Sequence, residues 1–259
     1  MEYINSKVIQ RKQYEYHKHC DGADTIVIFI HGILEGSMQF RSLAKIAYDA
    51  GYSTLVLLLP GHGKKGEDFA NTSMGKWIHY VNKRIKNMED KYRRIILVGH
   101  SMGGLLAVEY VSHFTSNVAK LILIGFPVKI WVNPRVIVGA YKISIGKINK
   151  KEKYVVAECR AMGVEATKLI GCMGWIPRYI ELLHLVYHSR KQIKKINLPI
   201  IIIQSCKDEF ICKKINKYIS KSNIQLYNLE NSYHFCYDHT DLNKLEEIIK
   251  RNFYQFKEK

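Results

Sequence analysis

Residues 95–110 read IILVGHSMGGLLAVEY. The first four are apolar and mostly β-branched, which is typical of a buried parallel strand, and residues 105–110 predict a helix. Between them a serine stands between glycines at a strand-to-helix turn, the pattern of a nucleophile elbow. We therefore expect Ser101 at the tip of a strained turn. Gly99 and Gly103 are expected there because a Cβ on either flank would clash.

Further apolar runs predict the remaining core of the fold. Buried strands are expected at 25–30, 53–59, 120–125, 198–205 and 224–229, with a weak edge strand at 14–17. Helical patterns lie at 40–47, 77–88 and 242–256. Strands that alternate with helices indicate an α/β fold, with a mostly parallel, doubly wound sheet covered on both faces.

The alternation stops after Pro127, and residues 128–190 look helical and irregular. This predicts a small helical cap, or lid, inserted between core strands, with 1–127 and 191–259 forming the core. Apolar side chains of this segment either line a cleft under the lid or pack the cap onto the core, and both interpretations stay open. The candidates for substrate binding are Trp131, Met173, Trp175 and Tyr179.

Composition narrows the class of protein. The 259 residues suit a single domain, and no apolar run is long enough to cross a bilayer, so stable membrane insertion is not expected. The N-terminal residues lack the apolar core of a signal peptide, so we expect a cytoplasmic protein. The six cysteines form no C-x-x-C pair and no zinc spacing, and we interpret them as reduced thiols.

The net charge of +17 has two interpretations. A basic face could bind nucleic acid, anionic lipid or an anionic substrate. The lysines are spread along the chain without an Arg-rich or aromatic-interleaved motif, however, which favours a background typical of an AT-rich genome. We therefore predict no nucleic-acid partner.

A serine nucleophile needs a base, and the base needs an acid to hold its tautomer. In this fold the acid follows a late strand, where Asp208 is the best candidate and Glu209 its rival. The base follows the last strand, where His234 is favoured over His239. The base must be neutral to accept the serine proton, so we expect activity to rise with pH through a near-neutral pKa.

The loop after the strand at 25–30 reads HGILEG. The backbone N–H of Ile33 in this loop and that of Met102 after the serine are expected to form an oxyanion hole. We interpret His31, His62 and His100 as bracing or site-lining residues. No His/Cys/Asp cluster has the spacing of metal ligands, so no metal is expected.

These motifs resemble the α/β-hydrolases of the carboxylesterase, monoacylglycerol lipase and lysophospholipase branch. The resemblance rests on residues 31–36, 60–63 and 99–104, on Asp208 and on residues 231–234, which span nearly the whole chain. It implies a Ser101–His234–Asp208 triad, hydrolysis through an acyl-enzyme, and neither metal nor organic cofactor. It also implies a small cap between the sixth and seventh core strands, at 128–190.

The resulting prediction is a serine hydrolase, a carboxylesterase or monoacylglycerol lipase-like enzyme, acting on esters of short- to medium-chain acyl groups. Its partner would be a small-molecule acyl ester, and the protein would be a monomer or homodimer. A thioesterase or lysophospholipase is the alternative, while a peptidase or C–C hydrolase is less favoured. A non-catalytic ligand-binding relative is the third class, against which the intact Ser, His and Asp set argues.

Overall fold

A seven-stranded sheet runs through the middle of the protein in the computed structural model, which describes residues 3–165, 169–212, 215 and 218–257. The first strand in spatial order pairs antiparallel with its neighbour, and all other neighbours are parallel. In spatial order the strands are β2 (Tyr16–Lys18), β4 (Ser53–Val56), β3 (Thr25–Ile30), β5 (Arg94–His100), β6 (Val118–Ile124), β8 (Ile200–Ser205) and β9 (Ile224–Leu229). The predicted α/β class with a mostly parallel, doubly wound sheet is confirmed.

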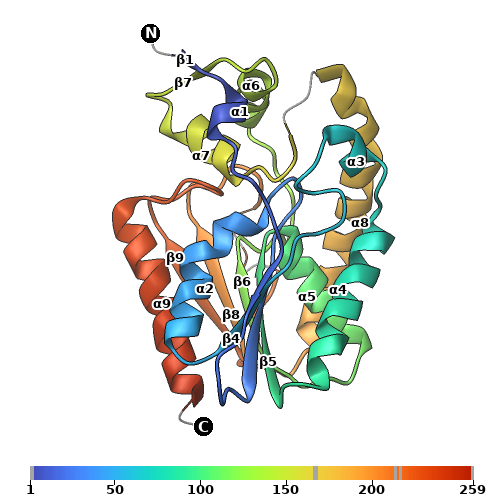
Figure 1. Cartoon of the computed structure of the whole chain (residues 1–259), viewed down its shortest axis with the longest axis vertical. Coiled ribbons are helices and arrows are strands. Elements are labelled where there is room, and N and C mark those ends of the chain that lie inside the picture. Colours follow the sequence, from blue (N-terminus) through green and yellow to red (C-terminus); the bar gives the residue numbers. More distant parts are fainter. Residues whose placement is uncertain (1–2, 166–168, 213–214, 216–217, 258–259) are drawn as a thin grey trace.

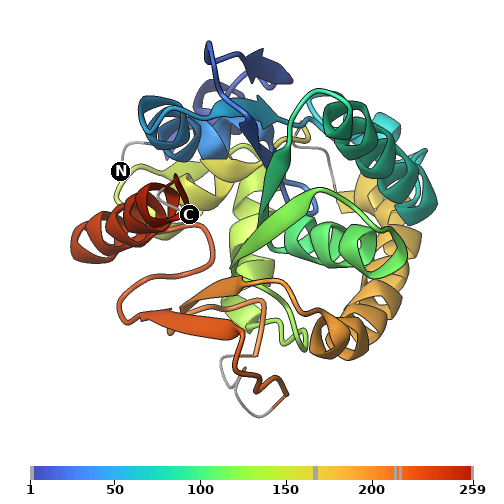
Figure 2. The ribbon, with the colours of Figure 1, turned by 90° about the horizontal axis from the view of Figure 1, so that it is seen from below.

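Helices cover both faces of this sheet (Figures 1 and 2). One face carries α2 (Arg41–Asp49) and α9 (His239–Lys257), and the other carries α4 (Met74–Glu89), α5 (Met102–His113) and α8 (Ile176–Gln192). The strand period of two sends alternate side chains to the two faces: Ile28 joins the larger core cluster with α4, α5 and α8, and Phe29 joins the cluster with α2 and α9. No described helix combines the length and apolar character needed to cross a membrane.

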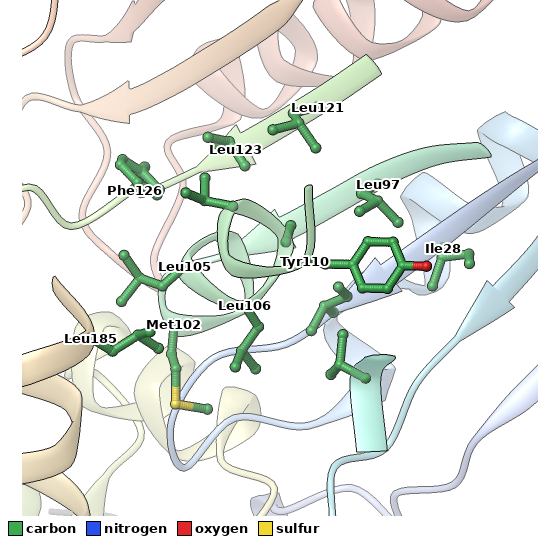
Figure 3. Close-up of a cluster of buried hydrophobic side chains, with 14 of the residues drawn as sticks. Ile28, Leu97, Met102, Leu105, Leu106, Tyr110, Leu121, Leu123, Phe126 and Leu185 are labelled. Atoms are coloured by element: carbon green, nitrogen blue, oxygen red, sulfur yellow. The ribbon is translucent and has the colours of Figure 1, made fainter. Parts of the chain in front are cut away.

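Helix α5 is buried along most of its length, as its mostly apolar sequence requires. Figure 3 shows Leu105, Leu106 and Tyr110 of α5 between leucines of the sheet and Leu185 of α8. This packing fixes the helix N-terminus, and so the residue that precedes it, Ser101, relative to the sheet.

The segment between β6 and β8 lies mostly beyond the carboxyl ends of the strands (Figure 1). It comprises α6 (Pro134–Ser144), β7 (Ile148–Asn149), α7 (Lys153–Ala161), η2 (Leu169–Trp175), α8 and η3 (Ile193–Lys195). Helix α8 differs from the rest of it, because Leu182, Leu185 and Val186 pack into the larger core cluster.

The N-terminal residues join the inserted segment rather than the sheet. Strand β1 (Tyr3–Ile4) pairs with β7, and Ile9 of α1 (Ser6–Ile9) packs with Ile148 and Val155. The division into a core of 1–127 and 191–259 and a cap of 128–190 stays a prediction, in which the first residues of the core contact the cap.

Two short helical elements follow strands of the sheet along the chain. The element η1 (Ser37–Phe40) comes after β3, and α3 (Gly66–Ala70) comes after β4.

The strand expected at 53–59 ends at Val56. Beyond it the Leu57 amide still donates to the Phe29 carbonyl, but the Leu59 amide donates to the His31 side chain. At Leu59 the His31 side chain, rather than a backbone carbonyl of the neighbouring strand, therefore accepts the hydrogen bond of the amide.

Candidate active site

Ser101 lies in a strained turn between β5 and α5. Its backbone has φ 53° and ψ −121°, a left-handed φ that a residue with a side chain rarely adopts. Its flanking glycines are required by close backbone contacts. A Cβ on Gly103 would lie 1.9 Å from the Ile30 carbonyl oxygen, and one on Gly99 would lie 2.4 Å from the Gly104 nitrogen. The geometry is that of the expected elbow.

The structure brings Asp208 and His234 together from two different loops. Asp208 follows β8 and His234 follows β9, and the His234 Nδ1 atom lies 2.7 Å from Asp208 Oδ2. The second oxygen, Oδ1, accepts hydrogen bonds from the amides of Phe210 and Ile211 at 2.9 and 3.1 Å. Both side chains are buried, so this pair is held rigidly and away from bulk water.

The rival residues occupy other places. Glu209 accepts a hydrogen bond from the backbone N–H of His234 at 3.3 Å, rather than from the ring. His239 begins α9, is exposed, and contacts Asn243. The ring of His234 is therefore hydrogen-bonded to Asp208, whereas Glu209 contacts only the backbone of His234.

His234 lies over the strand ends next to the elbow. A Cβ on Gly125 would touch the His234 ring at 3.2 Å, and the Ser101 amide donates to the neighbouring Ile124 carbonyl at 2.9 Å. The rings of His234 and His100 are 4.8 Å apart. The candidate nucleophile and base thus sit at the same edge of the sheet.

The charge around His234 sets its pKa. Burial lowers this pKa, but the Asp208 carboxylate and its hydrogen bond, followed by the Glu35 and Glu209 carboxylates, raise it to about 9. The value lies above the near-neutral pKa that the sequence led us to expect, because the sequence did not show how many carboxylates surround the ring.

The two amides expected in the oxyanion hole lie in the turn after β5 and in the loop after β3. Met102 is the first residue of α5, where backbone N–H groups lack partners within the helix. Ile33 lies in the loop after β3, between Gly32 and Leu34. Within the described part of the chain neither amide donates a hydrogen bond, so both remain available for a substrate oxygen.

Two further histidines, His31 and His62, pack against each other at the loop that follows β3. His31 Nδ1 lies 2.9 Å from the Gly32 carbonyl, and its Nε2 accepts from the Leu59 amide at 3.0 Å. Burial lowers the pKa of His31 to about 4, so the ring is neutral. His62 packs against His31 and Trp77. These contacts agree with the bracing roles that we expected.

Glu35 is a site residue that the sequence interpretation left without a role. Its side chain is 1% exposed, and it accepts a hydrogen bond from His100 Nδ1 at 2.8 Å. An acidic residue in an otherwise apolar loop next to a candidate oxyanion hole was the only available signal. Nothing in the sequence shows that it meets His100, 65 residues away.

Among the described residues, Glu35, His100 and His234 form the one group of three potential metal ligands, with ligand atoms within 4.8 Å of one another. Spacing along the chain could not reveal this group. In the structure Glu35 is hydrogen-bonded to His100, and His234 is hydrogen-bonded to Asp208. We therefore interpret the group as part of an acid–base network.

Comparisons with known proteins agree with this geometry. Residues 21–237 match the family described as serine aminopeptidase, S33. The chain belongs to this family. It is 24% identical over 220 residues to a thermostable monoacylglycerol lipase of Bacillus sp. strain H-257, covering 80% of this chain and 82% of that protein.

Solved structures of other lipolytic enzymes share the fold of this S33-family hydrolase. A metagenome-derived lipolytic enzyme matches with a TM-score of 0.71 and 19% identity, covering 93% of this chain and 99% of the other. The monoacylglycerol lipase of Paleococcus ferrophilus matches with a TM-score of 0.69 and 16% identity, covering 98% and 99%. The predicted class, a serine ester hydrolase of the α/β-hydrolase monoacylglycerol lipase and esterase branch, is confirmed.

The inserted segment of this S33-family member places a carboxyl group near His234 and Glu209. Glu158 of α7 is 7% exposed, and its Oε2 has no hydrogen-bond partner among the described residues. Burial and the neighbouring Glu209 raise its pKa to about 8, while its proximity to His234 opposes the rise. A pocket of about 320 Å³ adjoins this region, and its lining includes Tyr154, Asp208 and Glu209.

The four expected cap residues differ in exposure and in their contacts. Trp131 is 69% exposed and Met173 is 64% exposed. Trp175 is buried, packs against Phe69, and donates from Nε1 to the Gly66 carbonyl at 2.9 Å. The Trp131 amide donates to the Phe210 carbonyl at 2.8 Å, and the Phe210 ring lies 5.0 Å from the His234 ring. The Glu158 charge contributes to raising the pKa of Tyr179, after burial and Cys172. Their roles in substrate binding stay a prediction.

Proposed function

We propose that the enzyme hydrolyses carboxylic esters of short- to medium-chain acyl groups through an acyl-enzyme on Ser101, with monoacylglycerol-type esters as preferred substrates. The observation that carries the proposal is the 2.7 Å contact between His234 and Asp208 beside the strained turn of Ser101. The similarity to monoacylglycerol lipases over most of the chain supports it.

The geometry supports a two-step reaction. The Nε2 atom of His234 takes the Ser101 proton as the serine oxygen attacks the ester carbonyl. The amides of Ile33 and Met102 stabilise the resulting oxyanion, and Asp208 stabilises the imidazolium. The intermediate collapses when His234 returns the proton to the departing alcohol. Water, activated by the same histidine, then attacks the acyl-enzyme and releases the acid.

The Glu158 side chain favours ester substrates whose alcohol part carries free hydroxyl groups. A carboxyl group with a pKa of about 8 is mostly protonated at neutral pH, so it can both donate and accept hydrogen bonds. Its unpartnered oxygen costs free energy until a polar ligand group meets it. The free hydroxyls of a glyceryl ester are such groups, whereas a p-nitrophenyl leaving group has none.

The first experiment is labelling by a fluorophosphonate probe. The wild-type enzyme should be labelled once, and Ser101→Ala should remove the label. Labelling that survives in Ser101→Ala would contradict the assignment of the nucleophile. A folded wild-type enzyme that neither labels nor turns over any ester would favour a non-catalytic ligand-binding protein.

The second experiment is a chain-length panel of monoacylglycerols, p-nitrophenyl esters, acyl-CoAs, lysophospholipids and aminoacyl amides. The proposal predicts the highest kcat/KM for monoacylglycerols of short to medium chain. Glu158→Leu should reduce kcat/KM for monoacylglycerols by about tenfold or more, because a hydrogen bond to the substrate is lost, and leave p-nitrophenyl esters nearly unchanged. Highest activity on acyl-CoAs, lysophospholipids or amides would replace the proposed substrate class.

A further inference from the structure

The loop after β3 is built to turn the Glu35 side chain inward. Leu34 adopts φ 59°, a left-handed conformation that bends the chain back after Ile33. Gly32 leaves room for the returning carboxylate, because a Cβ at Gly32 would lie 2.4 Å from Glu35 Oε1. The loop thus accepts backbone strain and a required glycine in order to bury a charged group.

The buried carboxylate connects three parts of the site. Its Oε2 accepts hydrogen bonds from the Gly32 amide and from Gln39 Nε2, each at 2.6 Å. Its Oε1 accepts from His100 Nδ1 at 2.8 Å and lies 3.9 Å from His234 Nε2. One side chain therefore links the loop that carries the Ile33 amide, the last residue of β5 and the base.

We propose that Glu35 is a positioning residue that holds the oxyanion loop against the nucleophile elbow and stabilises the positive charge that His234 acquires on its Nε2 side. This inference rests on the proposed function, in which His234 Nε2 exchanges a proton with Ser101. Asp208 acts at the opposite nitrogen, Nδ1, so the two carboxylates have different tasks.

Glu35 is suited to this task because it stays ionised. Burial raises the pKa of Glu35, but His100, His234 and the Gln39 hydrogen bond lower it to a net value below the ordinary one. Of the described carboxylates, Glu35 alone lies within 4.0 Å of His234 Nε2. An ionised carboxylate at this distance favours the imidazolium that forms in the transition state.

Other titratable groups also face His234. They come from the loop after β8, from β5, from the segment after β9 and from α7, and they are Asp208, Glu209, His100, Tyr237 and Glu158. A test of Glu35 must therefore change its charge and leave these groups in place.

The experiment follows the imidazole of His234 directly by NMR titration, with the resonance assigned through His234→Gln. Glu35→Gln removes the charge at similar volume and should lower the pKa of His234 by about 1–3 units. Glu35→Asp keeps the charge and should retain most of the wild-type value. Glu15→Gln is the control, because Glu15 is a partly buried carboxylate that is held by Tyr80 and Arg84, and this change should leave the titration unchanged.

Kinetics supply the second readout. In Glu35→Gln the rising limb of kcat/KM should move to lower pH with the His234 pKa, and the plateau kcat should fall by about 10- to 100-fold with a smaller change in KM. A merely structural role would lower activity at every pH without moving the limb. Thermal unfolding of each variant confirms that the folded protein is measured.

The outcomes separate this inference from the proposed function. A His234 titration that is the same in wild type and Glu35→Gln overturns the inference, and so does an equal shift in Glu35→Asp and Glu35→Gln. A shift confined to Glu35→Gln supports it. If that shift occurs while Ser101→Ala retains full activity, the proposed function fails and the coupling of Glu35 to His234 stands.

Discussion

Raising the pH should activate the enzyme through deprotonation of His234. With a His234 pKa of about 9, only about 1% of molecules carry the neutral ring at pH 7. The free enzyme needs the neutral ring to accept the Ser101 proton, so kcat/KM at pH 7 should be about a hundredth of its alkaline plateau. A pH-stat assay with monobutyrin between about pH 5 and 10 measures this limb, with Ser101→Ala correcting for spontaneous hydrolysis.

The same proton contributes to stability. The folded pKa of about 9 exceeds the ordinary 6.5, so the folded protein binds the proton more tightly than the unfolded chain does. The contribution is therefore complete below about pH 6.5 and is lost as the pH rises through about 9. A difference of about 2.5 pKa units corresponds to roughly 3 kcal/mol of unfolding free energy.

Urea unfolding between about pH 6 and 10 measures this loss. Glu158 has a raised pKa as well, so its contribution also falls with rising pH, in the window from its ordinary 4.5 to about 8. The measurement is therefore made in Glu158→Gln. An apparent pKa for kcat/KM at or below 6.5, together with a flat stability profile in that variant, would refute the electrostatic reasoning about His234.

Three further predictions concern the acid, metals and the inserted segment. Asp208→Asn should lower kcat by about 10⁴-fold, because the amide stabilises neither the required tautomer of His234 nor the imidazolium. Glu209→Gln should keep far more activity, because Glu209 contacts only the backbone of His234. Equal losses of kcat in the two variants would contradict the pairing of Asp208 with the His234 ring. EDTA should leave ester hydrolysis unchanged, and loss of activity that a divalent ion restores would give the Glu35, His100 and His234 group a metal role. Trp175→Ala should cost about 3–5 kcal/mol in urea unfolding because it removes a buried ring that packs on Phe69, and a shifted chain-length optimum at unchanged stability would show instead that Trp175 lines the pocket.

Local chain signals predicted most of the fold, and they pointed to Asp208 and His234, whose side chains the structure joins. The strand and helix periods and the Gly-x-Ser-x-Gly turn are properties of short segments, so they can be recognised without tertiary contacts. Asp208 and His234 were found by their order after strands, and the structure joins their side chains. The rival carboxylate, Glu209, contacts the backbone of His234 where Asp208 contacts its ring, and no local pattern encodes that difference.

The features that were missed depend on contacts between distant segments. Helical phase could not tell whether Trp175 faces a channel or Phe69, because both partners are apolar. The pairing of β1 with β7 joins the first residues to the inserted segment through two-residue strands that are too short to show a period. Glu35 is one acidic letter in a loop, and its meaning arises only where His100 and His234 converge on it.

The contact between the inserted segment and the oxyanion loop changes how specificity and chemistry relate. The Gly163 amide, between α7 and η2, donates to the Leu34 carbonyl at 2.7 Å. Only a glycine fits there, because a Cβ on Gly163 would lie 2.1 Å from the Glu35 carbonyl oxygen. A substrate that displaces this segment would therefore act on the same loop that carries the Ile33 amide. Since interactions that strengthen in the transition state raise kcat, substrate contacts with the inserted segment can alter turnover as well as binding. We therefore expect substitutions at Gly163 to change kcat as well as KM, and a change confined to KM would show that the inserted segment acts on binding alone.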